Sequence, residues 1–452
     1  MSNVDRHPIA ILGDFSGNSV NPVTKRRFIA VDRDTIDQAI HLVRPSIELH
    51  LPYCHSLTIS KWVDFHPDQI VQRVPSLKAL LYAREEVGNP PAMRQHLAEA
   101  GASSDIDTEP AVSGEDANAS VSNESAPADD DLLDSILGGS PTLGQSPTSS
   151  VSARPSKVES KFDRMVRAIV EETSSGADFA REDARRAAID EELALRLRGI
   201  LHHPAFQAVE ANWTGARNIV RAGDATAVRL LDIRAGEVTA EAEAFLGLLE
   251  VSSGEEPHQF SHLLCNLEVT SHAEGLALCR LLSGFGAACG AAVVANVQPS
   301  ALFDGAVLDQ QLRQQVVEMS ADNLALAYPQ VLLRLPYGEE TEEIEEFEFE
   351  EFAAAPEPNQ YLWGGAAFAL GAALSGWREN GGPFGEIPSL PIHVYRAGTE
   401  TQSTGPVAEM LYEGRINGLN EAGVTCIVGV AGGDSAHVVG LRSLGGSSLL
   451  GD

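Results

Sequence analysis

The adjacent histidines His202 and His203 are the first residues whose type could do chemistry, because imidazole is a common metal ligand. Neighbouring residues on a helix point about 100° apart, and neither a carboxylate nor a third histidine stands at ligand spacing from this pair. Pro204 follows directly and restricts the residue before it, which favours a helix end. We therefore interpret the pair as a helix terminus and assign no metal ligand.

Three glycine-rich stretches invite comparison with nucleotide loops and nucleophile turns. Gly284–Gly290 precedes a predicted strand, whereas a pyrophosphate-binding loop follows one. Gly429–Gly433 has no Gly-Lys-Ser/Thr after it. Gly13–Gly17 contains Ser16 but lacks the Gly-x-Ser-x-Gly spacing and a base, so we predict a turn. No catalytic or cofactor-binding residue is assigned, and the residues favour a structural or binding protein over an enzyme.

Residues 339–357, here named the acidic run, contain ten carboxylates and no basic residue. The run could bind Ca²⁺, but it lacks the glycine bend and the alternating ligands of an EF-hand. A solvated acidic loop is the simpler interpretation. Phe347, Phe349 and Phe352 interrupt the acids, and we expect them to fix the loop to the body of the protein or to a neighbouring subunit.

Composition sets limits on the class of protein. The chain has 452 residues, with 64 acidic and 32 basic side chains, for a net charge of −32. That charge disfavours binding to nucleic acid or to an anionic membrane. No apolar run is long enough to cross a bilayer and no secretory signal opens the chain, so we expect a cytoplasmic protein. We expect its five cysteines to be reduced and buried: Cys54, Cys265, Cys279, Cys289 and Cys426.

A second acidic stretch divides the chain. Residues 101–154 are predicted to form a disordered linker, because residues 101–153 contain ten acids, no lysine or arginine and mainly small or polar residues. The division gives a small module at 7–100 and a large module at 155–452. Within the linker, residues 130–138 are predicted to form a short amphipathic helix that docks a partner. Its apolar face would consist of Leu132, Leu133, Ile136 and Leu137.

Both modules mix strands and helices. In the small module, Pro8–Leu12 is predicted to form a buried strand. Asp34 is predicted to cap a helix over Thr35–Val43, and Pro75 predicts a kink or the start of a new helix. In the large one, strands are predicted at 227–233, 263–269 and 291–297 with helices between them, an order that favours parallel pairing. Later strands are expected at 331–335, 391–395 and 426–430. The predicted fold class is α/β (α+β mixed), with mixed sheets flanked by helices.

Residues 8–86 resemble the small subunit, TssB, of the type VI secretion contractile sheath. The resemblance is carried by Ile11–Gly17, Arg27–Asp34 and, most specifically, Asp64–Leu81. Residues 189–445 resemble the large sheath subunit, TssC. The segments that carry this second resemblance are Ile200–Trp213, Val331–Gly338, Glu346–Glu351 and Tyr361–Phe368. The chain therefore resembles a fusion of the two subunits, the small one before the large one.

The resemblance implies a mechanical protein without catalysis. In the family, the two subunits form a tight heterodimer that polymerises from a baseplate around an inner tube of Hcp, and exchanged strands join neighbours. The implied partners are other sheath subunits, Hcp, the baseplate and an AAA+ unfoldase, which would recognise the helix at 130–138. We expect the modules at 8–100 and 189–445 to pack together, with the tether raising their effective concentration.

Two departures from the family keep alternatives open. We expect the small module to lack the usual extended segment before its first strand, and we expect the large module to be truncated at its C-terminus. The chain could therefore be a non-polymerising sheath accessory or an assembly regulator instead of a true sheath subunit. A third alternative is an α/β ligand-binding protein or enzyme that keeps only a relic of the sheath fold.

Overall fold

The residues that the computed structural model describes belong, except for Ala102, to one compact unit. Residues 103–177, which include the helix predicted at 130–138 and nearly all of the expected linker, lie outside the described residues. No helix among those described combines the length and the apolar character needed to cross a membrane. The described ranges are 7–18, 21–102, 178–223, 227–249, 258–269, 272–297, 303–304, 307–308, 321–380, 385–421 and 423–446.

A nine-stranded mixed sheet organises this unit, in the order β13-β17-β16-β10-β7-β6-β1-β5-β2. The six strands from β16 to β5 run parallel, and antiparallel strands close both edges. The α/β fold class is confirmed. The strands are β1 (Ile9–Gly13), β2 (Ile29–Val31), β5 (Val228–Asp232), β6 (His262–Val269), β7 (Ala292–Val297), β10 (Leu324–Tyr328), β13 (Glu386–Ile387), β16 (Val424–Gly429) and β17 (Ala436–Val439).

The first strand of the chain lies inside this sheet. Ile9 is in register with Val228 of β5 on one side and with His262 of β6 on the other. All five residues of β1 are buried, as both faces of an inner parallel strand require. The small module, from here on called the N-terminal segment, was expected to pack against the large module, from here on called the C-terminal segment. That packing is confirmed, and both segments contribute strands to a single sheet.

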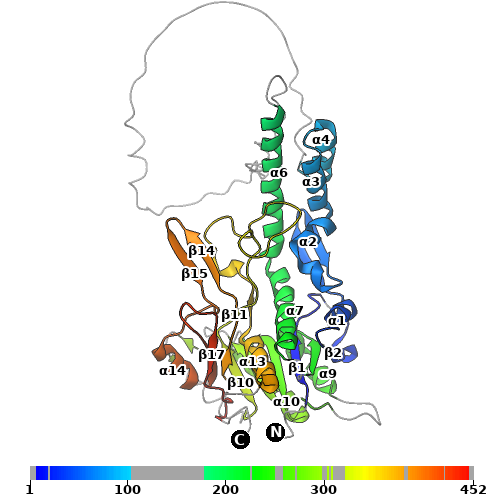
Figure 1. The fold of residues 1–452 in the computed structure, drawn as a ribbon. Coiled ribbons are helices and arrows are strands. Elements are labelled where there is room, and N and C mark those ends of the chain that lie inside the picture. Colours follow the sequence, from blue (N-terminus) through cyan, green and yellow to red (C-terminus); the bar gives the residue numbers. More distant parts are fainter. Residues whose placement is uncertain are drawn as a thin grey trace, which may run out of the picture. The chain divides into compact units, whose positions relative to one another are not determined.

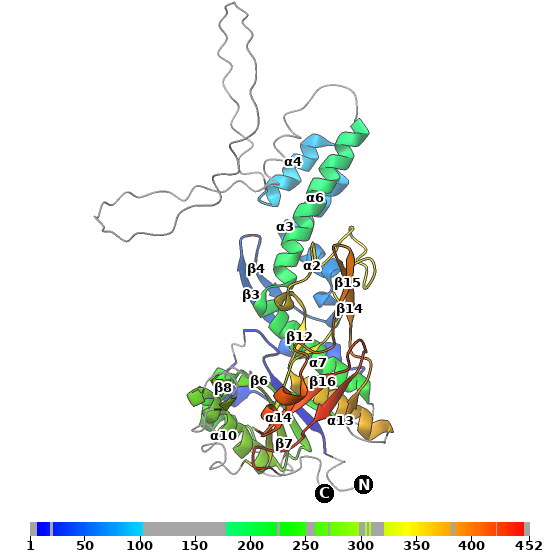
Figure 2. The same ribbon diagram turned by 90° about the vertical axis from the view of Figure 1, so that its left-hand side faces the viewer.

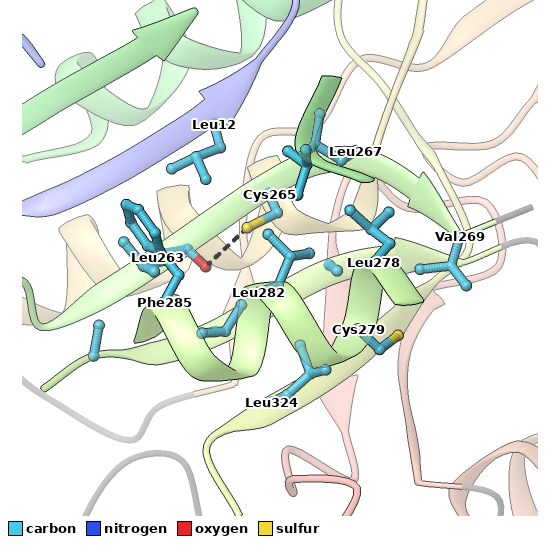
Figure 3. Packing of buried hydrophobic residues seen from close by; sticks show 14 of the residues in the cluster. Leu12, Leu263, Cys265, Leu267, Val269, Leu278, Cys279, Leu282, Phe285 and Leu324 are labelled. Carbon is cyan, nitrogen blue, oxygen red and sulfur yellow. Dashed lines mark hydrogen bonds between the residues drawn. The ribbon is translucent and has the colours of Figure 1, made fainter. Parts of the chain in front are cut away.

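Helices cover both faces of the sheet (Figures 1 and 2). Side chains on a strand alternate between the two faces of the sheet. Cys265 of β6 faces α10, as Figure 3 shows. The next residue back, Leu264, faces α13 on the other side, where a β-carbon on Gly371 would meet it. The core cluster in Figure 3 joins Leu12 of β1 to Phe285 of α10, so the N-terminal segment is part of the main core. The covering helices are α7 (Pro204–Ala222), α8 (Ala235–Ala240), α9 (Ala242–Gly247), α10 (His272–Cys289), α13 (Ala366–Asn380) and α14 (Glu413–Glu421).

Helices from both segments also pack on each other away from the sheet (Figure 1). Arg84 of α3 forms an ion pair with Asp190 of α6 at 2.5 Å, and Arg196 of α6 donates to the Ala100 carbonyl at 2.7 Å. The remaining helices are α1 (Ile36–Val43), α2 (Pro67–Arg73), α3 (Pro75–Glu85), α4 (Pro90–Glu99), α6 (Asp178–Leu201) and the 3-10 turns η2 (Val23–Lys25), η3 (Trp62–Phe65) and η4 (Pro358–Gln360). Four two-stranded pairs complete the described elements: β3 (Ser46–Leu51) with β4 (Cys54–Thr58), β8 (Phe303–Asp304) with β9 (Val307–Leu308), β11 (Val331–Leu332) with β12 (Trp363–Gly364), and β14 (His393–Ala397) with β15 (Glu400–Thr404).

Local signals in the sequence set several of these boundaries. Pro75 starts a new helix, because proline suits the first helical turn. Pro204 likewise starts α7 after α6 ends at Leu201. The capping prediction was wrong: α1 follows Thr35, and Asp32, not Asp34, accepts the Thr35 N–H at 2.9 Å.

Candidate functional site

Two aspartates hold the turn that follows β1. Asp14 accepts the N–H of Gly17 at 2.8 Å, which closes the turn predicted at Gly13–Gly17. Asp232, at the end of the neighbouring β5, accepts the N–H groups of Phe15 at 2.9 Å and Ser16 at 3.0 Å. These bonds satisfy backbone donors of the turn, which lie beyond the end of the β1 ladder. The turn of the N-terminal segment is thus fixed by a side chain of the C-terminal segment.

Trp213 of α7 packs on the same turn. Its indole N–H donates to the Phe15 carbonyl at 2.9 Å, and its ring meets the Phe15 ring edge-on with centroids 5.0 Å apart. Both side chains are fully buried. An aromatic pair adds stabilisation beyond its buried area, and the satisfied indole removes the penalty of burying a donor. The joint between the segments is therefore both apolar and hydrogen-bonded.

A chain of side-chain amides crosses the carboxyl ends of the strands. The Ala367 N–H donates to Asn296 Oδ1 at 3.0 Å, and Asn296 donates to Asn266 Oδ1 at 2.6 Å. Asn266 then donates to Asn212 Oδ1 at 3.0 Å, and Asn212 donates to the Asp14 carbonyl at 3.1 Å. This amide chain links α13, β7, β6, α7 and the end of β1. Because each amide both donates and accepts, the chain fixes the relative positions of five elements.

Two glycines leave room for the amide chain. A β-carbon on Gly365 would overlap the Asn296 amide nitrogen and the Asn266 amide oxygen. A β-carbon on Gly13 would overlap the Asn212 amide oxygen. Neither position has a positive φ, so the requirement for glycine comes from the close approach of the amides and not from the backbone.

A buried guanidinium ties the N-terminal segment to the start of α8. Arg26 donates to both carboxylate oxygens of Glu237, at 2.6 and 2.8 Å, and to the Asp232 carbonyl at 2.8 Å. Burial acts to raise the pKa of Glu237, but hydrogen bonds from Arg26 and Arg234 outweigh it and lower that pKa to about 2. A bidentate pair of this kind fixes geometry as well as charge.

A second ion cluster joins α7 to the acidic run. Arg334, which follows β11, donates to Glu210 of α7 at 2.7 Å and to Glu351 of the run at 2.8 Å. The Tyr337 N–H also donates to Glu351 at 2.8 Å, and His202 Nε2 lies 3.5 Å from its other oxygen. Both carboxylates are only 1% exposed. The prediction of a wholly solvated acidic loop is therefore wrong at Glu351.

The two carboxylates of this cluster have opposite pKa shifts. Burial raises the pKa of Glu210, against the attraction of Arg334. Burial also acts to raise the pKa of Glu351, but Arg334, His202 and the Tyr337 N–H outweigh it and lower that pKa to about 2. A single guanidinium cannot fully compensate two buried charges, so the carboxylate with more donors takes the charge.

The acidic run is anchored by apolar side chains and by the N-terminal segment. Phe347 and Phe349 are buried, which confirms that phenylalanines fix the run to the body. Asp68 of α2 accepts the N–H groups of Glu345 at 3.1 Å and Glu346 at 3.2 Å. The exposed carboxylates of the run thus stand on a backbone that both segments hold.

A cavity of about 650 Å³ opens above the carboxyl ends of β1, β5, β6 and β7. Parallel α/β sheets commonly bind ligands at this edge, near the point where the chain reverses its strand order. Burial raises the pKa of Asp14, which lines the cavity. Among the described residues, no group of three or more side chains is arranged to hold a metal ion. Further lining residues are Asn212, Arg234, Asn266, Glu268, Asn296, Tyr361 and Trp363.

The residues first considered for chemistry do not come together. His203 is the N-cap of α7, where its Nδ1 accepts the Ala205 N–H at 3.2 Å, while His202 faces Glu351. Gly284–Gly290 lies at the end of α10, before β7, as predicted. Gly429–Gly433 spans the end of β16 and its turn into β17. All five cysteines are buried free thiols.

Sequence reasoning missed the residues that hold the joint. Glu210 stands on the buried face of α7 beside Val209 and Trp213, where an apolar residue is expected. Asn296 interrupts the otherwise apolar strand β7. A polar residue on a buried face signals a specific partner, because burying it unpaired is unfavourable. That signal was present, but nothing local identified the partner.

Comparison with known proteins agrees with this architecture. Residues 183–445 match the family model described as EvpB/VC_A0108, tail sheath N-terminal domain. The chain belongs to this tail sheath family. Residues 7–100 match a second family model, described as type VI secretion system, VipA, VC_A0107 or Hcp2. The resemblance to small and large sheath subunits fused in one chain is therefore confirmed.

One curated relative extends the comparison to a named sheath protein. It is the type VI secretion system sheath protein TssC1 of Pseudomonas aeruginosa, 24% identical over 252 residues. The match covers 46% of this chain and 50% of the relative. This chain thus spans about half the length of the curated relative that it matches.

Gly365→Ala tests the amide chain. The new methyl group would push Asn296 and Asn266 apart, and we expect the free energy of unfolding to fall by about 2–4 kcal/mol, from overpacking and lost hydrogen bonds. Gly284→Ala is the matched control, since its β-carbon, at an exposed position of α10, would meet nothing within 4 Å. Helix propensity predicts a gain of about 0.5–1 kcal/mol there. Denaturant unfolding measures both, and equal effects would contradict the role of the amide chain.

Glu351→Gln tests the buried ion cluster. Its folded-state pKa of about 2 lies below the ordinary 4.5, so its stabilisation is present above pH 4.5 and is lost as the pH falls toward 2. We expect the variant to lose about 3 kcal/mol at neutral pH and to lose less further stability on acidification than the wild type.

Glu210→Gln is the control for that experiment. Its raised folded-state pKa means that the folded protein holds the Glu210 proton more tightly, so its contribution grows as the pH falls. We expect a smaller loss at neutral pH and a steeper loss of stability in acid. Chemical unfolding over the acid range distinguishes the two, and identical pH profiles would contradict the assignment of charge to Glu351.

Proposed function

We propose that this chain is a structural subunit of a type VI secretion contractile sheath, acting through its subunit interfaces. The observation that carries the proposal is the position of β1. Residues 7–100 match a VipA model, and their first strand is hydrogen-bonded between two strands of the segment that matches the tail sheath model. Such a chain would deliver both sheath subunits to the assembly as one preformed building block.

The geometry of the joint supports a mechanical role. Strand β1 of the N-terminal segment pairs with two strands of the C-terminal segment, and the amide chain and the Arg26–Glu237 ion pair also join the two segments. A force applied to one segment therefore passes to the other through buried bonds. Interactions of this kind resist separation because breaking them exposes unpaired polar groups and apolar surface. We propose that the work of this protein is done by these contacts in the cytoplasm and not by catalysis.

The proposed partners follow from the same role. We propose that sheath subunits of the same kind are the immediate neighbours, and that an inner tube of Hcp and a baseplate complete the assembly. Support comes from the family models and from the relative named as a sheath protein.

Electron microscopy of the purified full chain tests the proposal. We expect negatively stained tubes or stacked rings, and we expect Ile11→Asp to abolish them, because a carboxylate at a fully buried position of β1 would break the shared sheet. Thr58→Asp, at an exposed position of β4, is the control and is expected to assemble normally. Single particles under all conditions would favour a non-polymerising accessory. A compact monomer that binds a small molecule would favour the ligand-binding alternative.

We also propose that Leu132, Leu133, Ile136 and Leu137 form the helix that a recycling AAA+ unfoldase recognises. Support comes from the apolar spacing of these residues after three consecutive aspartates. Leu133→Asp is expected to abolish capture by the unfoldase N-domain, since it places a charge on the docking face. Ser135→Asp adds the same charge outside that face and is the control. Equal capture of both variants and the wild type would rule out the docking helix.

A further inference from the structure

The hairpin β14–β15 presents a strand edge without a partner in the described part of the chain. Its two strands pair only with each other. One face packs on the body, where the His393 ring lies 5.6 Å from Phe352 and Tyr361 hydrogen-bonds to His393 at 2.8 Å. The other face carries Val394, a residue that is 55% exposed. The hairpin is therefore fixed at its inner face and open along its edge.

The register of the hairpin shows which backbone groups this edge offers. Gly398 and Thr399 form a two-residue loop between the paired residues Ala397 and Glu400, with Gly398 at a φ of 64°. The pair next to such a loop exchanges both backbone hydrogen bonds, and pairs of this kind alternate along the hairpin. Val394 and Arg396 stand at the intervening positions, so their N–H and C=O groups point away from β15.

A groove of about 830 Å³ runs along this edge. Five consecutive residues, from Ile392 to Arg396, line it together with Thr401 of β15, so residues on both faces of β14 border the groove. The opposite wall is formed by the acidic run and the residues before it, which Figures 1 and 2 show close to the hairpin. A strand of five residues spans about 17 Å, enough for an extended peptide to pair with it.

The groove carries an excess of negative charge. Its lining includes Glu339, Glu340 and Glu350 but only one arginine, Arg396. Glu350 and Glu340 lie close enough to His393 to raise its pKa, although burial lowers that pKa overall. Unlike Glu351, which pairs with Arg334, these three carboxylates form no salt bridge with a described residue, and the Glu350 carboxylate accepts only the Glu339 N–H at 3.0 Å among the described groups. A cationic occupant would relieve their mutual repulsion.

We propose that the β14 edge is a docking site for an extended, basic segment of another protein, which pairs with Val394 and Arg396 as an added strand. Main-chain hydrogen bonds would supply the pairing, and alternate lysine or arginine side chains would reach the carboxylates. The proposal goes beyond assembly of like subunits, because the occupant is a partner of opposite charge. A second copy of this chain, with a net charge of −32, is a poor match for an acidic groove.

Peptide binding to the full chain tests this site. The probe is a labelled peptide of alternating lysine and valine, followed by fluorescence anisotropy, with an alternating glutamate and valine peptide of equal length as the comparison. We expect the basic peptide to bind and to weaken with added salt, since exposed charges are screened. Equal binding of both peptides, or no binding of the basic one, would overturn the proposal.

Two pairs of variants separate the edge from the charge. Val394→Pro removes only an N–H that points into the groove and is expected to weaken binding by about tenfold, whereas Val394→Ala keeps that donor and is expected to bind as the wild type does. Glu340→Lys reverses a groove charge and is expected to weaken binding by about tenfold. Glu343→Lys makes the same change on the acidic run outside the groove and is expected to have little effect.

The readouts also distinguish the occupant. Circular dichroism and denaturant unfolding show whether each variant remains folded. The Glu340→Lys and Glu343→Lys variants should have the same spectrum and the same free energy of unfolding. If the two lysine variants bind the peptide equally, or if Val394→Pro binds as Val394→Ala does, the strand-addition site is wrong. If sedimentation shows self-association that Val394→Pro abolishes, the edge belongs to a second copy and the proposal of a basic partner fails.

Discussion

The hydrogen bonding of β1 on both of its edges is the constraint on which the rest of the structure depends. An inner strand of a parallel sheet offers backbone donors and acceptors to both sides, and each must be paired once water is excluded. Here the strand comes from the first residues of the chain, while its neighbours β5 and β6 come from beyond residue 227. Removing it would leave β5 and β6 with facing unpaired edges and an open core. The two segments therefore fold as one body, whatever lies between them in sequence.

The polar interactions at the joint add specificity to this constraint. The amide chain, the Asp232 contacts with the β1 turn and the Arg26–Glu237 pair each require one relative position of the two segments. Hydrophobic burial alone tolerates small shifts, whereas hydrogen-bonded groups in a dry interior do not, because a displaced donor or acceptor loses its partner and gains no water. This explains why Gly13 and Gly365 stand where a methyl group would displace an amide.

The acidic run shows how a charged sequence becomes part of a folded structure. Its buried positions, Ile344, Phe347, Phe349 and Glu351, face inward, Glu346 is half-buried, and its other acidic residues are exposed. Arg334 compensates the one acid that is fully buried, and Asp68 of the N-terminal segment accepts the backbone N–H groups of the run. The run is thus an ordered surface next to the β14 edge, where it concentrates negative charge in a fixed place.

The sequence by itself determined the alternation of strands and helices, the α/β class, the helix start at Pro75, the helix end before Pro204, and the resemblance of both segments to sheath subunits. These features depend on local propensity, on the spacing of apolar residues or on motifs that the chain carries intact. Helix α13 escaped prediction because it is rich in small residues and apolar on several faces, which hides the amphipathic period of a surface helix. Strands β10, with five residues, and β17, with four, also escaped prediction, because a short strand carries little periodic signal.

Only the tertiary structure decided where β1 inserts, which buried polar residues become partners and which strand edge stays open. Glu210, Arg334 and Glu351 are separated by more than a hundred residues at their widest, and Asn212, Asn266 and Asn296 stand on different elements. Each of these side chains is unfavourable in a buried position by itself and becomes favourable only when its partner arrives. That dependence on a distant residue is the physical reason why sequence patterns located the elements but not the contacts that join them.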